Sequence, residues 1–314
     1  MKQKQTFNTM SFNVSDISGY IQANERQLIG KAVTGSKTAS MLNLQVGVVG
    51  TANLNLLTAT AGLQDGSSCG FNAGEGDVTI SKRQIVAKPI KVNQEFCDKD
   101  LLGSSLQWGV RMAAGQTTIP FTQMFVDQIV KEVNKEVENI LWQGNTTVNG
   151  GTYLDLADGL LTILDAASGS TIDGSVSGKT LAANPYDVIS NIIAVLPDET
   201  IDMNNVIFVG YDVYRKFIAE LQAKNLYHYT ADLTSAMEIV IPGTNVKLVG
   251  VPGLIGTGKA VATYPENLYL GTDMLNDKET ADFWFSKDDD VFKLKISFAI
   301  GTQVAFPDLV VVAE

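Results

Sequence analysis

Residues 120 to 143 read PFTQMFVDQIVKEVNKEVENILWQ, and this stretch decides the fold. Its apolar residues recur at spacings of four, three, four and three, namely Val126, Val130, Val133, Val137 and Ile140. Such spacing places them on one face of an α-helix. At 1.5 Å per residue this helix would be ~36 Å long. We therefore expect it to span the domain to which it belongs.

Upstream of this helix, residues 46 to 90 combine two β-prone arms with a loop that is rich in glycine. The pattern predicts a long β-hairpin. A two-stranded hairpin is only marginally stable in water, so we expect its tip to pack on a neighbouring subunit. The alternative is an irregular surface loop. The residues assigned to this interface are Gly62, Gly66, Gly70 and Gly74.

The first part of the chain, residues 1 to 45, is polar and has one amphipathic helix candidate near Ile17 to Ile29. The apolar residues of this candidate form only a partial stripe. We interpret the segment as an N-terminal arm with little core of its own.

Downstream of the long helix, residues 151 to 274 alternate between helix and strand patterns. Helices are expected from Pro185 and from Asp212, with the buried strand Val206 to Val209 between them. Further strand patterns follow at Val246 to Val249, Ala260 to Thr263 and Leu268 to Leu270. This order predicts an α/β domain.

The C-terminal part carries the strongest strand pattern. From Val291 to Ile300 apolar and polar residues alternate, and the pattern extends towards Phe306. Phe283 to Phe285 precede it, joined by the acidic turn Lys287-Asp288-Asp289-Asp290. We predict a second hairpin with an acidic tip; only the family resemblance given below adds the four residues of this turn to the candidate interface residues.

The sequence from Gly253 to Ala260, GLIGTGKA, fits a phosphate-binding loop up to its last position. There Ala260 replaces the Ser or Thr whose hydroxyl would reach magnesium. A strand pattern follows where a helix would be needed. We therefore interpret this segment as a glycine-rich turn between strands.

Catalytic chemistry has little support elsewhere in the sequence. His228 is the only histidine, and Cys69 and Cys97 form no CxxC pair. The three aspartates of the acidic turn could bind a cation, but such groups are usually solvated. We expect no catalytic, cofactor or metal site, and we expect that the protein is not an enzyme.

The net charge of −11 over 314 residues gives no electrostatic footprint for nucleic acid. The first residues lack the apolar core of a secretory signal. No run approaches the ~20 apolar residues needed to span a membrane. We expect reduced cysteines and a protein that is neither secreted through such a signal nor embedded in lipid.

The order of these elements resembles the tailed-phage capsid fold of the Hong Kong 97 type, an α+β fold. The helix 120–143 looks like the spine helix of that family's peripheral domain, and residues 46 to 90 look like its extended loop. Asn184-Pro185-Tyr186-Asp187 resembles the helix start that opens the axial domain, and Val206 to Gly210 with Tyr211-Asp212 resembles its central strand and next helix. Tyr269-Leu270-Gly271 and the closing Val304 to Val310 are also similar to family sequences.

The resemblance implies a division of the chain into six parts. These are an N-terminal arm (1–45), an extended loop (46–90), a peripheral domain with the spine helix (91–150), an axial domain (151–274), return strands of the peripheral domain (275–305) and a C-terminal strand to the axial domain (306–314).

It also implies a function without catalysis, in which pentamers and hexamers of a major capsid protein form an icosahedral virion shell around double-stranded phage DNA. Assembly would take place in the cytoplasm of a bacterial host. Implied partners are other copies, a portal and possible decoration proteins, with DNA close by but not specifically bound. Only about 45 residues precede the hairpin, so we expect scaffolding to be a separate protein. The alternatives are an encapsulin-type nanocompartment shell, an α/β enzyme, and a fibre or tail protein.

Overall fold

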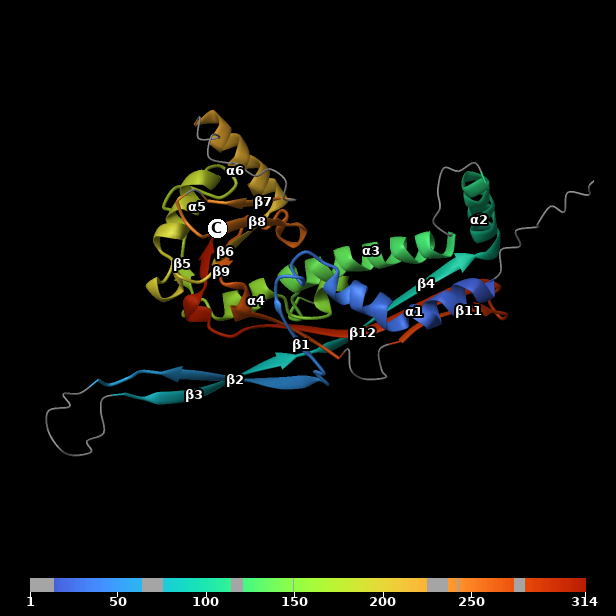
Figure 1. Ribbon diagram of the computed structural model, residues 1–314, viewed down its shortest axis with the longest axis horizontal. Coiled ribbons are helices and arrows are strands. Elements are labelled where there is room, and N and C mark those ends of the chain that lie inside the picture. Colours follow the sequence, from blue (N-terminus) through green and yellow to red (C-terminus); the bar gives the residue numbers. More distant parts are fainter. Residues whose placement is uncertain are drawn as a thin grey trace, which may run out of the picture. The chain divides into compact units, whose positions relative to one another are not determined.

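The computed structural model describes residues 14–63, 76–113, 121–148, 150–224, 237–241, 243–273 and 280–314 (Figure 1). The chain forms two compact units. The first contains Met1–Ser40, Pro89–Glu138 and Asp273–Ala299, and the second contains Met41–Lys88, Asn139–Thr272 and Ile300–Glu314.

In the first unit, residues 291–299 of β12 (Val291–Val304) pair antiparallel with β11 (Thr280–Ser286), and β4 (Lys88–Cys97) also pairs with β12. β11 and β12 form the predicted second hairpin, in which Ala281 lies opposite Ile296 and Phe285 opposite Phe292. Buried and less buried residues alternate along β12, as expected for a strand with one face on a core. The strand continues to Val304, four residues beyond the strongest part of the sequence pattern.

Helix α3 (Phe121–Gln143) confirms the predicted long helix to within one residue; Pro120 lies outside the described residues. Four valines on its predicted stripe are buried, namely Val126, Val130, Val133 and Val137. In the first unit, Val126 and Val130 line an apolar site together with Leu294 and Ile296 of β12. The second and third turns of this helix therefore pack near β12.

Helix α1 (Val14–Thr34) differs from the expected short helix with little core. It is longer at both ends, and several of its apolar residues are buried, among them Ile17, Ile21, Leu28, Ala32 and Val33. The helix lies on β11, where the Glu25 carboxylate accepts a hydrogen bond from the Ala281 amide at 2.9 Å. The expectation was wrong because Ala32 and Val33 extend the apolar stripe into a segment that appeared polar on average.

The second unit is built on a mixed sheet with β6 (Val206–Gly210) in its interior. All five residues of β6 are buried, which is typical of a strand covered on both faces. The sheet order is β5 (Ile172–Asp173), β13 (Val311–Ala313), β9 (Ala260–Thr263), β6, β8 (Lys247–Val251) and β7 (Glu238–Val240). The strands expected at 206, 246 and 260 are thereby confirmed.

Helices cover this sheet. Ile207 and Val209 of β6 share a buried cluster with residues of α5 (Pro185–Ala194) and α6 (Tyr211–Ala223). Phe208 points to the opposite face because side chains alternate along a strand. There it meets the Trp142 ring at 5.3 Å between centroids. Helix α4 (Leu160–Ala166) adds the buried Leu160 and Leu164 to the second unit.

A smaller group of strands in the second unit carries the predicted first hairpin. β1 (Asn43–Val46) pairs in parallel with β10 (Leu268–Thr272), and β10 pairs with residues 300 to 304 of β12. The hairpin consists of β2 (Thr51–Ala59) and β3 (Val78–Val86), paired antiparallel over their full lengths.

Candidate functional site

The β2–β3 hairpin is the candidate association element. Among the described residues β2 and β3 pair only with each other, so no third strand supports them. Gly47 and Gly50 at its entrance have φ values of +78° and +75°. Residues 64 to 75 of its loop lie outside the described residues.

The base of the hairpin rests on a pair of glycines. Gly271 of β10 and Gly301 of β12 lie directly opposite each other. A Cβ atom on Gly301 would lie 2.2 Å from the Val86 carbonyl oxygen, and one on Gly271 would lie 2.6 Å from Cγ2 of Ile85. We call this pair the glycine notch. It admits β3 at a distance that any larger residue would prevent.

Side-chain hydrogen bonds hold the hairpin in the notch. Arg83 Nη1 donates to the Val304 carbonyl oxygen at 2.7 Å, and Gln303 Nε2 donates to the Gln84 carbonyl oxygen at 2.6 Å. Ile85, the next residue along β3, is fully buried. The base of the hairpin is therefore part of the core of the second unit.

Beyond the notch Leu54 and Leu56 are still buried, but other apolar residues of the far half are exposed. Leu57 and Ile80 lie opposite each other, and their side chains are 64% and 66% exposed. Val78 and Leu63 are also exposed. We call Leu57, Val78 and Ile80 the distal apolar face. Removing such side chains from water stabilises an association by about 1.5–3 kcal/mol each, so this surface is suited to binding a partner.

The acidic turn of the second hairpin is exposed at all four positions, Lys287, Asp288, Asp289 and Asp290. Asp289 is engaged within its own chain, where it accepts hydrogen bonds from Lys293 and from Ser286 Oγ. The hydrogen bond from Lys293 lowers the pKa of the Asp289 carboxyl. Asp290 adopts a φ of +54° to close the turn. One of the three aspartates therefore already has a basic partner.

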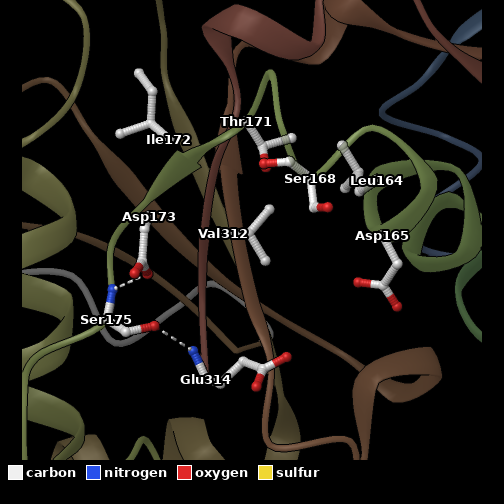
Figure 2. Close-up of a pocket in the computed structure, with 9 residues that line it drawn as sticks. All are labelled: Leu164, Asp165, Ser168, Thr171, Ile172, Asp173, Ser175, Val312 and Glu314. Atoms are coloured by element: carbon white, nitrogen blue, oxygen red, sulfur yellow. Dashed lines mark hydrogen bonds between the residues drawn. The ribbon is translucent and has the colours of Figure 1, made fainter.

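A polar pocket of about 330 Å³ lies in the second unit beside β5 and β13 (Figure 2). Its carboxylates are those of Asp165, Asp173 and Glu314. Lys259 Nζ lies 2.9 Å from carboxylate oxygens of both Asp165 and Glu314. Asp173 accepts a hydrogen bond from the Ser175 amide at 2.8 Å, which holds the pKa of this carboxyl below its usual value.

This pocket is a poor candidate for an active site. The residues that line it include serine and threonine hydroxyls but no histidine, cysteine or lysine. It therefore lacks an imidazole or thiolate that could serve as nucleophile or activating base, and the Lys259 amine beside it is held as a cation by Asp165 and Glu314. Its charges instead join β13 to α4 through Lys259.

The segment from Gly253 to Ala260 joins two strands. β8 ends at Val251 and β9 begins at Ala260, so the predicted glycine-rich turn between strands is confirmed. Gly256 and Gly258 have φ values of +75° and +67°. Burial opposes the charge of Lys259, but its hydrogen bonds to Asp165 and Glu314 outweigh this effect and raise its pKa.

The structure describes only some of the candidate interface residues. Gly62 is exposed, as are the four residues of the acidic turn. Gly66, Gly70 and Gly74 lie outside the described residues, as do His228 and Cys69. Cys97 is exposed and free.

Sequence reasoning missed the residues that anchor the hairpin. Gly271 and Gly301 carried a usable signal, because a glycine inside a strand pattern indicates close approach of another backbone. Arg83 and Gln303 carried no such signal, because their partners are backbone carbonyl groups far away in the sequence. Helix α2 (Asp98–Ala113) was not expected either.

Over the part of the chain that the structure describes, no group of three or more His, Cys, Asp or Glu side chains is placed to hold a metal ion. In the same residues no helix has both the length and the apolar character to cross a membrane.

No protein-family model matches the sequence, and no curated protein sequence matches it. Solved structures do match. A chain of the satellite phage P4 procapsid, solved including the size determination (Sid) protein, superposes with a TM-score of 0.62 at 13% identity, covering 96% of both chains. A chain from the capsid of an empty GTA particle gives a TM-score of 0.55 at 11% identity, covering 90% of this chain and 89% of that one.

A virus-like particle from Pyrococcus furiosus also matches, with a TM-score of 0.50 at 12% identity over 91% of this chain and 96% of that one. At these identities the similarity establishes the fold. The chain is a mixed helix-and-sheet protein with the fold of capsid-protein structures, over nearly its whole length.

Proposed function

We propose that this chain is the major capsid protein of a tailed bacteriophage, and that its copies form an icosahedral shell around double-stranded phage DNA. The observation that carries the proposal is the superposition on the P4 procapsid chain, which covers 96% of both chains. An anchored hairpin with an exposed apolar end supports it, because such a surface is suited to joining copies of one protein.

The fold suggests how the parts of the chain serve a shell. We assign residues 1–45 as the N-terminal arm, 46–90 as the extended loop, 91–150 and 275–305 as the peripheral domain, and 151–274 with 306–314 as the axial domain. Copies would associate as pentamers and hexamers in the host bacterial cytoplasm. A separate scaffolding protein, a portal and decoration proteins are the further partners that we propose.

The role in this shell is structural and not enzymatic. The described pocket lacks the groups of an activated nucleophile, and the capsid structures that match are parts of assembled particles. The net charge of −11 suits a container for DNA, because a shell that repels its contents does not bind them tightly.

Expression of the chain, alone and with a candidate scaffolding protein, tests the proposal by electron microscopy. We expect closed particles of uniform size. Protein that stays monomeric under both conditions would contradict it. An encapsulin-type shell is the alternative, and the contents of purified particles distinguish the two. Particles matured in infected cells would hold DNA, whereas a nanocompartment would hold a protein cargo.

Deleting residues 60 to 76 tests the role of the hairpin. The deletion removes the loop beyond the paired strands and leaves the glycine notch intact. We expect folded subunits or capsomers that fail to close into shells. Normal particles from this variant would show that the hairpin loop is dispensable.

A further inference from the structure

The turn that follows helix α1 lies against helix α3 in the first unit. At the end of α1 the Gly35 amide donates to the Lys31 carbonyl oxygen at 2.9 Å. The chain then folds back on itself, because the Ser40 amide donates to the Ser36 carbonyl oxygen at 3.1 Å. We call residues 35 to 40 the post-α1 turn. Its buried members are Ser36, Thr38 and Ala39.

Two side chains of α3, one helical turn apart, face the post-α1 turn. Asn134 lies against Gly35, since a Cβ atom on that glycine would be 2.8 Å from Asn134 Nδ2. Glu138 is 1% exposed, and its carboxylate oxygens accept hydrogen bonds from the Thr38 amide at 3.0 Å and from the Thr38 hydroxyl. The Ser36 side chain also hydrogen-bonds this carboxyl. Helix α3 therefore presents an amide and a carboxyl group to one short segment.

The surroundings of Glu138 favour a neutral carboxyl. Burial raises the pKa of Glu138, and it outweighs the hydrogen bonds from Thr38 and Ser36 and the charge of Lys37, all of which favour the ionised form. Other charged residues near the contact, Lys31 at the end of α1 and Lys135 and Glu136 on α3, are exposed, so water and salt screen their charges. The site therefore favours the neutral form more than water does.

Asn134 supplies an independent reason for a proton on Glu138. Its Oδ1 atom is buried and has no hydrogen-bond donor among the described residues. Side chains four residues apart are neighbours on one face of a helix, which brings the Glu138 carboxyl within reach of this oxygen. A protonated carboxyl has an O–H donor and can still accept, whereas an ionised carboxylate only accepts. The protonated form can therefore serve both Thr38 and Asn134.

We propose that Glu138 is a proton-controlled latch for the post-α1 turn. With its proton, the carboxyl donates to Asn134 Oδ1 and accepts from Thr38, which keeps the turn closed on α3. Release of the proton to solvent leaves a charge in a buried site and Asn134 Oδ1 without a donor, so the turn opens more often. The latch is most stable below the ordinary carboxyl pKa of 4.5 and weakens as pH rises through the folded-state pKa. The inference concerns the single subunit and does not depend on the proposed function.

Hydrogen exchange of the amides in the turn tests the latch. In the full-length chain the Thr38, Ala39 and Ser40 amides are hydrogen-bonded and should exchange when the turn opens. We expect the opening equilibrium to rise at least about threefold between pH 5 and pH 8, after the intrinsic exchange rate is divided out. Glu138→Gln cannot ionise, so its opening equilibrium should stay constant. A constant value in the wild type, or the same rise in both proteins, overturns the proposal.

Asn134→Leu separates the proposed hydrogen bond from burial alone. Leucine is similar to asparagine in shape but accepts no hydrogen bond, so the protonated carboxyl loses its acceptor while the site still excludes water. We expect the pKa of Glu138 to fall, as measured by the ¹³C shift of its carboxyl against pH. If burial alone were responsible, a more apolar neighbour would raise this pKa further.

Asn139→Leu is the matched control on the same helix. The Asn139 amide donates to the Tyr153 hydroxyl at 3.1 Å and not to the post-α1 turn, so this variant should leave the pKa of Glu138 unchanged. A rise, or no change, in Asn134→Leu overturns the proposal. A wild-type Glu138 pKa at or below 4.5 also overturns it, and this measurement needs no variant at Asn134 to fold.

Discussion

The two hairpins of the chain differ in what covers them. In β11–β12, the residues Phe283, Leu294 and Ile296 are buried in the first unit, where helices α1 and α3 also bury their apolar stripes. In β2–β3, Ile85 at the base and Leu54 and Leu56 on β2 are buried, whereas Leu57 and Ile80 further out are exposed. An apolar strand residue thus stabilises the subunit in one hairpin and is available for association in the other.

Substituting one apolar residue by aspartate in each hairpin should give the largest difference in the free energy of unfolding. Ile296→Asp buries an unpaired carboxylate in the first unit, so we expect a loss of about 3–5 kcal/mol in the free energy of unfolding. Ile80→Asp leaves the carboxylate in water and should change the same quantity by less than ~0.5 kcal/mol. Urea unfolding of dissociated subunits measures both. Equal losses would mean that the far half of β2–β3 also belongs to the subunit core.

The glycine notch holds the base of β3 against β10 and β12. Gly301→Ala places a methyl group against the Val86 carbonyl oxygen, and we expect a loss of roughly 1–3 kcal/mol from overpacking. Faster hydrogen exchange at the β3 amides should accompany this loss. Gly169→Ala is the control, because nothing lies within 4 Å of its Cβ position. If the two variants were equally stable, β3 would not be held in the notch.

Substitutions of Glu138 test how much a buried carboxylate stabilises the first unit. Its buried carboxylate accepts a hydrogen bond from the Thr38 amide at 3.0 Å and another from the Thr38 hydroxyl, which fixes the chain that follows α1 to α3. Glu138→Ala removes this acceptor, and we expect a loss of about 2 kcal/mol. Glu138→Gln keeps an acceptor and a donor for Thr38 and should be close to wild type.

The pH dependence of this pair of variants has a defined sign. Burial raises the pKa of the Glu138 carboxyl above its ordinary value of 4.5. Its contribution to stability is therefore fully present below pH 4.5 and declines as pH rises through the folded-state pKa. Wild-type protein should lose stability relative to Glu138→Gln over that range. A constant difference between pH 4 and pH 8 would contradict the raised pKa.

Substitutions in the acidic turn should change the stability of the isolated subunit less than the other variants do. Its three aspartates are exposed, and exposed ion pairs contribute little. Replacing all three by Asn should leave the melting temperature of the subunit nearly unchanged. We expect a measurable shift in the assembled shell, where symmetry-related turns would meet with Lys287 or Arg83 of neighbours. Equal effects on shell and subunit, or none on either, would show that the turn faces solvent in both.

The same variant has a predictable response to acid. The hydrogen bond from Lys293 lowers the pKa of the Asp289 carboxyl below its ordinary value of 3.8. The stabilising contribution of Asp289 is present above pH 3.8 and is lost as pH falls through the lowered value. Any difference between the variant and wild type should therefore diminish in strong acid.

The periodicity of apolar residues predicted those helices and strands that bury one face of a single continuous segment. The long helix α3, the hairpins and the strand at Val206 were expected from their own residues, and the structure confirms them. The expectation was wrong for α1, because its stripe becomes clear only when β11 supplies the opposing surface. Helix α2 was not predicted. Its described side chains include no buried apolar stripe of the kind by which a helix is recognised in a sequence.

The candidate site was less predictable than the fold. The hairpin itself could be expected from glycines and β-prone arms, but its anchoring depends on contacts between segments more than 180 residues apart, such as Arg83 with Val304 and Gly301 with Val86. The interface assigned to Gly62 and to the acidic turn stays a prediction. Contacts between copies of the chain leave no periodic pattern of apolar residues in the sequence of one chain.

The glycine notch also determines the mechanics of the hairpin. Seven residues separate Ile85, held in the notch, from Val78, which corresponds to a lever arm of about 23 Å. A rotation of ~10° about this fulcrum would displace the Val78 end by roughly 4 Å, while the residues in the notch would hardly move. Slight angular differences at one pair of glycines would therefore let identical chains reach neighbours at different distances. A larger side chain at either glycine of the notch would restrict the rotation of the hairpin. It would thereby narrow the range of curvatures that an assembly of these chains could adopt.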